Sequence, residues 1–140
     1  MYNPKQGDII RLDFNPTRGH EQQGRRLALV VSNATYNKYG RGIAIVCPIT
    51  NTDRGIATQT KLDDRTVTTG VIMSDQLKAL DLNERNPEYI ESLPPDILEE
   101  VCDIVGSFTE IEDDIIEETG IEDDDREEIY TPKMDDDHTS

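Results

Sequence analysis

The stretch Leu27-Ala28-Leu29-Val30-Val31 is a continuous run of apolar residues between polar segments. A short run of this kind is typical of a strand that is buried on both faces. A second apolar run, residues 43–47, ends at Pro48 and predicts another buried strand. The sequence therefore predicts two central strands, and the remaining elements are interpreted around them.

Shorter strand signals surround these two runs. Apolar residues alternate over residues 9–14, which predicts a half-buried strand. Weaker signals at residues 58–62 and 70–73 predict two further strands, whereas the polar segment 32–42 is expected to be a connection. Many short strands without intervening helices favour a small antiparallel barrel.

One helix is indicated after the strands. Ser92 is a candidate N-cap, and Pro94 and Pro95 suit a first helical turn. The apolar residues that follow share one helical face: Ile97, Leu98, Val101, Ile104, Val105 and Phe108. We expect this face to cover one end of the barrel, and a contribution to a dimer contact is the alternative.

The formal net charge of −16 is unevenly distributed along the chain. Residues 1–50 hold seven Lys and Arg against three Asp and Glu, whereas residues 110–140 hold fifteen acidic residues against two basic ones. Such acidic runs repel themselves and bury too little apolar surface to fold. We therefore expect a domain over residues 1–109 whose N-terminal part is basic, and a flexible acidic tail over residues 110–140.

The cysteines and the apolar runs limit the class of protein. Cys47 and Cys102 lie in apolar contexts, which predicts buried free thiols rather than a disulfide. With two His and no cysteine cluster, we expect neither a metal site nor a cofactor. No signal peptide or membrane span is indicated, so we expect a cytoplasmic protein.

A polar loop over residues 16–26 carries groups that could act on a phosphodiester. Metal-free RNA cleavage needs a base for the 2′-OH, an acid for the leaving 5′-oxygen and a cation for the phosphorane. His20, Arg26 and a carboxylate could together supply these groups. Composition alone favours the alternative, a solvated surface loop.

Three short segments occur in a recognisable order and spacing. They are Asn15-Pro16-Thr17-x-Gly19-His20-Glu21-Gln22-Gln23-Gly24-x-Arg26, then Pro48-Ile49-Thr50, then Thr69-Gly70-Val71-Ile72-x-Ser74-Asp75-Gln76-x-Lys78-x-x-Asp81. Together they closely resemble the signatures of the MazF/Kid/PemK toxins, and the resemblance covers roughly residues 6–109.

The resemblance implies a fold and an activity. The fold is a mainly β, SH3-like antiparallel barrel of the CcdB/PemK/MazF type with a C-terminal helix. The activity is that of a toxin endoribonuclease, which cleaves single-stranded mRNA at short sequences independently of the ribosome. Cleavage proceeds by 2′-OH attack without a metal. A homodimer and a cognate antitoxin are implied as well.

The resemblance also implies a set of site residues. Arg26 and Thr50 match the Arg/Thr pair of MazF-type cleavage, and His20 and Asp75 match the His and Asp of the Kid branch, with Asp75 as candidate base. The residues expected to contact RNA are Glu21, Gln22, Arg25, Asn51, Gln76 and Lys78. The alternatives are a strand-end hydroxyl bonded to backbone for Thr50 and a turn cap for Asp75.

Two positions depart from the family pattern. Kid-like members carry an Arg two positions before the motif Asp, where this chain has Met73. If that Arg is the general acid, this chain must use another group, and we expect Arg26. The Pro that usually follows the loop Arg is Leu27 here, with little expected effect.

These departures leave other functions open. One is a catalytically weakened or tail-autoinhibited toxin-like protein, and another is a non-catalytic binding toxin like the related gyrase poison CcdB. Antitoxins of this family cover their toxin with an acidic segment that bears apolar anchors, and residues 110–140 have that composition. A tethered tail acts at roughly millimolar effective concentration, so weak affinity would suffice to compete with RNA. A disordered solubilising tail is the alternative.

We predict that a chain of residues 1–109 cleaves RNA faster than the full-length chain at low salt. The difference should shrink at high salt, because contacts between an acidic tail and a basic groove are screened. The measurement is the cleavage rate of both chains at two ionic strengths. Equal rates under both conditions would exclude autoinhibition.

Overall fold

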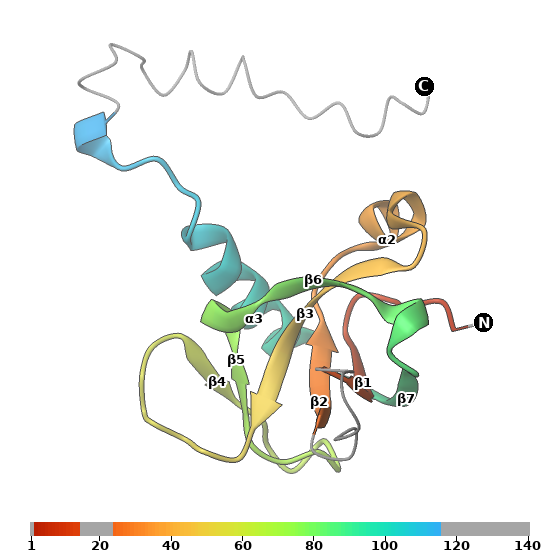
Figure 1. Ribbon diagram of the computed structural model, residues 1–140. Helices are drawn as coiled ribbons and strands as arrows, with labels where there is room; N and C mark the ends of the chain where they lie inside the picture. The colour runs from red at the N-terminus through yellow and green to blue at the C-terminus, as the bar shows by residue number, and fades with distance from the viewer. Residues whose placement is uncertain (1, 15–23, 116–140) are drawn as a thin grey trace. The chain divides into compact units, whose positions relative to one another are not determined.

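The computed structural model describes residues 2–14 and 24–115 (Figure 1). The chain divides into two compact units, Met1–Phe108 and Thr109–Ser140, and the sheet belongs to the first. Among the described residues, no helix has both the length and the apolar character needed to cross a membrane.

The described residues form seven strands in one antiparallel sheet. The strands are β1 (Asp8–Asp13), β2 (Arg25–Val30), β3 (Ile43–Thr50), β4 (Gln59–Lys61), β5 (Val71–Met73), β6 (Lys78–Asp81) and β7 (Glu88–Ser92). Their order is β4-β5-β3-β2-β1-β7, and β6 pairs with β3 outside this path. The helical elements are α2 (Ala34–Gly40), η1 (Ser74–Gln76), η2 (Leu82–Glu84) and α3 (Pro95–Ser107). The predicted mainly β fold with a C-terminal helix is confirmed.

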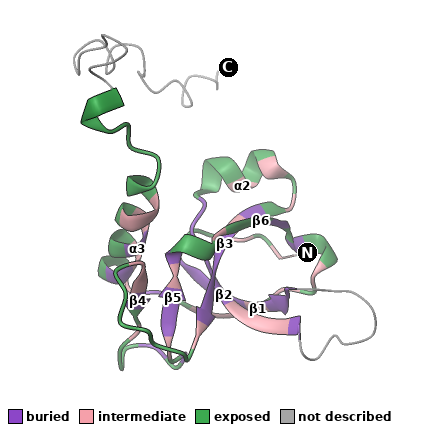
Figure 2. Cartoon of the chain, turned by 60° about the vertical axis from the view of Figure 1, so that its left-hand side comes forward, coloured by how far each residue is buried: buried purple, intermediate pink, exposed green. Residues whose placement is uncertain are grey.

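The predicted strands all appear, but one predicted connection was wrong. Residues 32–42 contain the helix α2, which begins after Asn33, whose side-chain oxygen accepts a hydrogen bond from the Tyr36 amide at 2.9 Å. None of the residues of α2 is buried (Figure 2). Because this helix has no buried face, its sequence carries no apolar period, and the cap was the available signal.

The predicted start of α3 also needs correction. The N-cap is Pro94, and no side chain caps the helix. Ser92 is instead the last residue of β7, and its hydroxyl is hydrogen-bonded to the Tyr89 hydroxyl at 2.9 Å. The sequence signals missed β7 and β6, which have few buried residues.

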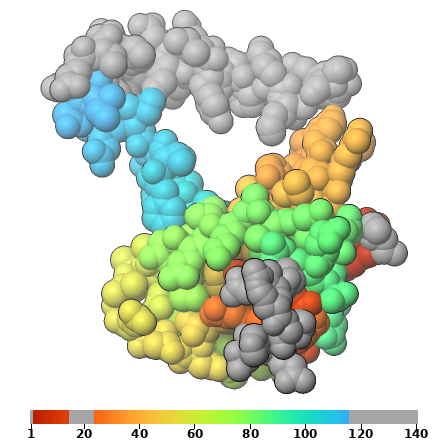
Figure 3. All heavy atoms as spheres, in the orientation of Figure 1, coloured from red at the N-terminus to blue at the C-terminus, as the bar shows by residue number. Residues whose placement is uncertain are grey.

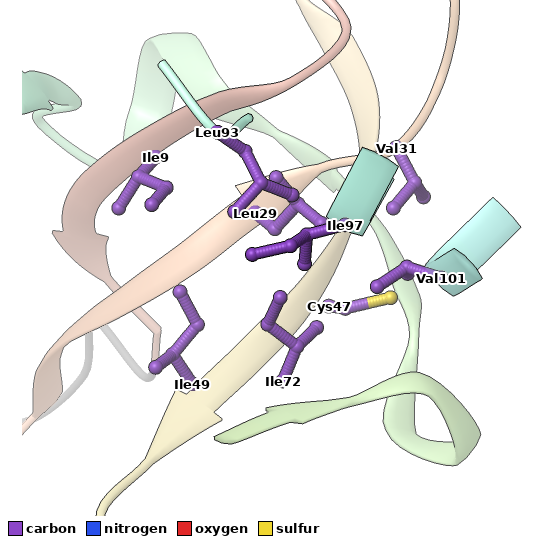
Figure 4. Packing of buried hydrophobic residues seen from close by; sticks show 9 residues of the cluster. All are labelled: Ile9, Leu29, Val31, Cys47, Ile49, Ile72, Leu93, Ile97 and Val101. Carbon is purple, nitrogen blue, oxygen red and sulfur yellow. The ribbon is translucent and has the colours of Figure 1, made fainter. Parts of the chain in front are cut away.

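Both faces of the central strands are buried, because alternate residues enter two different cores. The first core lies between the sheet and α3, and its side chains point toward one another in Figure 4: Ile9, Leu29, Val31, Cys47, Ile49, Ile72, Leu93, Ile97 and Val101. The second core is formed by Ile10, Leu12, Phe14, Ala28, Val30, Ala44, Val46, Leu80 and Leu82. Burial on both faces explains the continuous apolar runs at residues 27–31 and 43–47.

Both cysteines are free thiols, as predicted. Cys47 is buried in the first core, and this burial raises the pKa of its thiol to about 12. Cys102 on α3 is less deeply buried than expected, and partial burial raises its thiol pKa as well.

The backbone at Gly70 brings β5 against the end of β3. Gly70 has a φ of 113°, and a Cβ there would lie 2.3 Å from the Thr50 carbonyl oxygen. Only glycine allows this approach at low cost. The approach brings the segment after β5, which carries Asp75, close to Thr50.

We predict that Val101→Ala lowers the free energy of unfolding by about 2 kcal/mol, because it removes two methyl groups from a fully buried site. Val67→Ala is the matched control, since the Val67 side chain is 87% exposed. It should change stability by less than about 0.5 kcal/mol. Urea unfolding of both variants measures the difference, and similar losses would contradict the assigned docking of α3.

Candidate functional site

A cavity of about 320 Å³ lies beside the start of β2, the end of β3 and the end of β5. It is lined by Arg26, Thr50, Thr52, Arg54, Ile56, Gln59, Met73, Asp75 and Gln76. In Figure 3, atoms of β2 (orange), of the loop after β3 (yellow) and of the segment around β6 (green) share one face of the first unit. Three of the four residues expected to be catalytic line this cavity, and His20 lies outside the described residues.

Arg26 lies in β2 opposite Leu12, and its guanidinium carbon is 5.7 Å from the centre of the Phe14 ring. The quadrupole of an aromatic ring attracts a cation that lies over its face and does not neutralise the charge of that cation. Across the described part of the chain, the Arg26 side chain makes neither an ion pair nor a hydrogen bond. Its positive charge is therefore available to a ligand in the cavity.

The Thr50 hydroxyl lies at the end of β3, where its oxygen accepts a hydrogen bond from the Thr52 amide at 3.2 Å. The backbone contact that was the alternative interpretation of Thr50 is therefore present. Because this contact uses an oxygen lone pair, the hydroxyl hydrogen remains free to be donated. Thr50 can thus donate to an oxygen of a ligand in the cavity.

Asp75 lies in the short helix η1 after β5. The N-cap of η1 is Met73, and no side chain caps this helix, so the turn-cap interpretation of Asp75 is not supported. Asp75 has no hydrogen bond or ion pair with other residues in the described ranges. The carboxylate can therefore accept a proton or a hydrogen bond from a ligand.

Arg25 is separated from Arg26 by the alternation of side chains along β2. Its guanidinium forms an ion pair with Asp13 at 2.9 Å and donates to the Asn86 carbonyl oxygen at 3.2 Å. Asn86 in turn donates to the other Asp13 oxygen at 2.8 Å. This network joins β1, β2 and the segment before β7, and Arg25 does not line the cavity.

The other expected RNA-contacting residues are divided between three places. Gln76 lines the cavity, and the Lys78 ammonium lies 5.4 Å from the centre of the Phe14 ring, which Arg26 also approaches. The Asn51 side-chain oxygen accepts a hydrogen bond from the Thr69 hydroxyl at 3.0 Å, which ties the loop after β3 to the segment before β5. Glu21 and Gln22 lie outside the described residues. An RNA contact by any of these residues stays a prediction.

Four lining residues were not anticipated from the sequence: Thr52, Arg54, Ile56 and Gln59. They lie in and after the polar loop that follows β3 and belong to none of the three signature segments. An arginine beside a glycine in a polar loop was the one available signal. Within residues 2–14 and 24–115, no group of three or more His, Cys, Asp or Glu side chains is arranged to hold a metal ion.

Comparison with known proteins gives one consistent result. Residues 5–108 match the family described as PemK-like, MazF-like toxin of type II toxin-antitoxin system. Endoribonuclease PemK from Escherichia coli is 36% identical over 101 residues, which cover 69% of this chain and 75% of that protein. Endoribonuclease toxin MazF from the same species is 33% identical over 98 residues, which cover 70% of this chain and 86% of that protein.

Solved structures agree with the sequence relatives. MazF from Deinococcus radiodurans (Form-I) is 37% identical with a TM-score of 0.67, covering 77% of this chain and 97% of that chain. The MazE-MazF structure (Form-II) from the same organism gives 32% identity and a TM-score of 0.66, with 77% and 96% covered.

We predict that the Asp13 network makes stability depend on pH below about pH 4. Hydrogen bonds from Asn86 and Arg25 lower the pKa of the Asp13 carboxyl below its ordinary value of 3.8. The ionised form therefore stabilises the fold above that value, and this contribution is lost as the pH falls through the lowered pKa. In Asp13→Asn, the midpoint of thermal unfolding should change less with pH below pH 5 than it does in the parent chain.

Asp64→Asn is the control, because Asp64 is exposed and has no ion pair in the described part. Thermal unfolding of the three proteins at several pH values makes the comparison. An Asp13→Asn profile that parallels the parent chain would contradict the assignment.

Proposed function

Because this chain belongs to the PemK-like, MazF-like toxins of type II toxin–antitoxin systems, we propose that it is a toxin that cleaves mRNA. The chain is an endoribonuclease, like the PemK and MazF relatives that it matches over about two thirds of its length. In our proposal, cleavage occurs in single-stranded RNA at short specific sequences, independently of the ribosome and without a metal ion.

The observation that carries this proposal is the meeting of three side chains in one cavity. Arg26, Thr50 and Asp75 come from β2, β3 and the segment after β5, yet all three line the same space. Arg26 and Asp75 make no ion pair with another described residue, so opposite charges remain available to a substrate. The Asp75 carboxylate and the Arg26 guanidinium match the base and the cation that metal-free phosphodiester cleavage requires, and the Thr50 hydroxyl adds a hydrogen-bond donor.

The proposed reaction is an internal transfer at phosphorus. The 2′-oxygen attacks the adjacent phosphorus while Asp75, the candidate base, takes its proton. The bond from phosphorus to the 5′-oxygen then breaks, which leaves a 2′,3′-cyclic phosphate and a 5′-hydroxyl. Arg26 would stabilise the charge of the phosphorane, and Thr50 would donate a hydrogen bond to a phosphate oxygen. The leaving 5′-oxygen takes a proton for which Arg26 and His20 are the candidates.

The proposed partners follow from the family. Single-stranded RNA is the substrate, and an antitoxin is the protein partner, which the solved MazE-MazF relative supports. We also propose a homodimer in the cytoplasm. A non-catalytic toxin of the CcdB kind would need no Arg26, Thr50 and Asp75 around one cavity, so their arrangement supports cleavage. A weakened toxin remains the second candidate because Met73 lines that cavity in place of an Arg.

We predict that Arg26→Ala and Thr50→Ala each lower the cleavage rate at least about 100-fold without loss of folding, since each removes stabilisation of the transition state. Lys38→Ala and Thr35→Ala on the exposed helix α2 are matched controls that should cleave normally. Mapping the cut ends of a long RNA gives both the rate and the end chemistry.

The reaction should continue in EDTA. Activity that disappears in EDTA and returns with Mg²⁺ would contradict the proposed mechanism. Termini with a 3′-hydroxyl and a 5′-phosphate would contradict attack by the 2′-OH.

A further inference from the structure

The basic side chains of the described residues fall into a paired and an unpaired group. Those with ion pairs are Arg11, Arg25, Lys61 and Arg65, and Arg85 donates to two backbone carbonyl oxygens. Arg54 lines the cavity, and its guanidinium makes no ion pair or hydrogen bond within the described ranges. Arg26 and Arg54 therefore bring two positive charges without an ion-pair partner in the described ranges to one cavity, from β2 and from the loop after β3, opposite the single carboxylate of Asp75.

The turn that carries Arg54 is held by the side chain of Gln59. The Gln59 side-chain oxygen accepts a hydrogen bond from the Arg54 amide at 2.8 Å. Its nitrogen donates to the Thr52 carbonyl oxygen at 3.3 Å. One amide side chain at the start of β4 thus bonds the backbone on both sides of Asp53. This contact fixes the place from which the Arg54 side chain extends.

The neighbouring acid does not neutralise Arg54. The Asp53 carboxylate accepts a hydrogen bond from the Gly55 amide at 2.9 Å and forms an ion pair with Lys61 at 3.4 Å. Both contacts lower the pKa of Asp53, with the bond from Gly55 as the larger cause. The carboxylate is therefore engaged with Lys61, and the charge of Arg54 is left for a ligand.

Met73 is the position at which this chain departs from the Kid-like pattern, and it is paired with the residue that holds this turn. Met73 lies directly opposite Gln59 in the pairing of β4 with β5, and both residues line the cavity. A cation at position 73 and a cation on the turn held by Gln59 therefore serve the same space. Met73 cannot supply a charge, whereas Arg54 can.

We propose that Arg54 supplies the second positive charge of the cleavage site, in place of the cation absent at Met73, and that Gln59 positions it. This inference rests on the proposed function, since it assigns residues to the same site. In this proposal, Arg54 acts by its charge and by hydrogen bonds to the non-bridging phosphate oxygens. It transfers no proton, and the proton steps remain with the other residues of the site.

The first test is Arg54→Ala beside Lys38→Ala, which removes an equal charge from the exposed helix α2. Under single-turnover conditions Arg54→Ala should cleave about 100-fold more slowly, with a smaller change in KM, because the charge acts mainly on the transition state. Lys38→Ala should remain within about twofold of the parent chain. Equal effects of the two substitutions would overturn the proposal.

A binding measurement separates this inference from the proposed function. Single-stranded RNA with 2′-O-methyl riboses has no free 2′-OH and cannot be cleaved by the proposed route. In Arg54→Ala, the slope of the logarithm of the RNA-binding constant against the logarithm of the salt concentration should fall in magnitude by about one unit, as expected for the loss of one phosphate contact. If the slope falls in Arg54→Ala but the parent chain does not cleave RNA, the phosphate contact of Arg54 stands and only the proposed function is refuted. An unchanged slope would refute the phosphate contact of Arg54.

The second test moves the cation across the cavity. In the Arg54→Ala background, Met73→Arg should restore cleavage at least about tenfold, because position 73 lines the same cavity. Met73→Lys is a comparison that restores the charge without the planar guanidinium. If neither Met73→Arg nor Met73→Lys restores cleavage in a normally folded chain, the proposal that Arg54 takes the place of a cation at position 73 is overturned.

The third test concerns the positioning role of Gln59. Gln59→Met removes both backbone contacts while keeping the length of the side chain, so it should slow cleavage in the parent chain. In the Arg54→Ala background it should have little further effect, because the group that it positions is gone. Equal losses in both backgrounds would show a merely structural role and overturn the assignment.

Discussion

Strand β3 pairs with β6 at its start, with β2 along its middle and with β5 at its end, so a neighbouring strand is hydrogen-bonded to it along its whole length. Its alternate residues enter two separate cores, and a shift of register by one residue would exchange them. The strand is therefore fixed along its whole length, and Thr50 at its end is fixed with it. The close approach at Gly70 then places the segment that carries Asp75 next to Thr50. The geometry of the cavity is thus a consequence of how the core is packed.

The period of a strand also divides the basic residues by role. Arg25 and Arg26 are adjacent in the sequence, yet one completes an ion-pair network with Asp13 and the other lines the cavity without an ionic partner in the described part. Two consecutive arginines therefore have different roles: Arg25 joins β1 to β2, and Arg26 gives the cavity a positive charge. A similar division follows β3, because Lys61 on β4 is paired with Asp53 while Arg54 in the preceding loop remains unpaired among the described residues.

Much of the fold followed from the sequence, because residues 27–31 and 43–47 owe their apolar runs to burial on both faces. Helix α2 did not follow, since none of its residues is buried and no period marks it. Strands β6 and β7 did not follow either, because few of their residues enter a core. In the site, Arg26, Thr50 and Asp75 were found through the family signatures. Arg54 and Gln59 depend on a side-chain contact within a polar loop, and no local pattern of residue types encodes such a contact.

The buried ring of Phe14 holds both Arg26 and Lys78 within 6 Å of its centre. Each cation is attracted to the face of the ring, so one aromatic side chain gathers two positive charges. A polyanion that binds the folded chain through these charges, and does not bind the unfolded chain, would stabilise the fold. Folding and ligand occupancy are therefore thermodynamically linked through a single aromatic side chain.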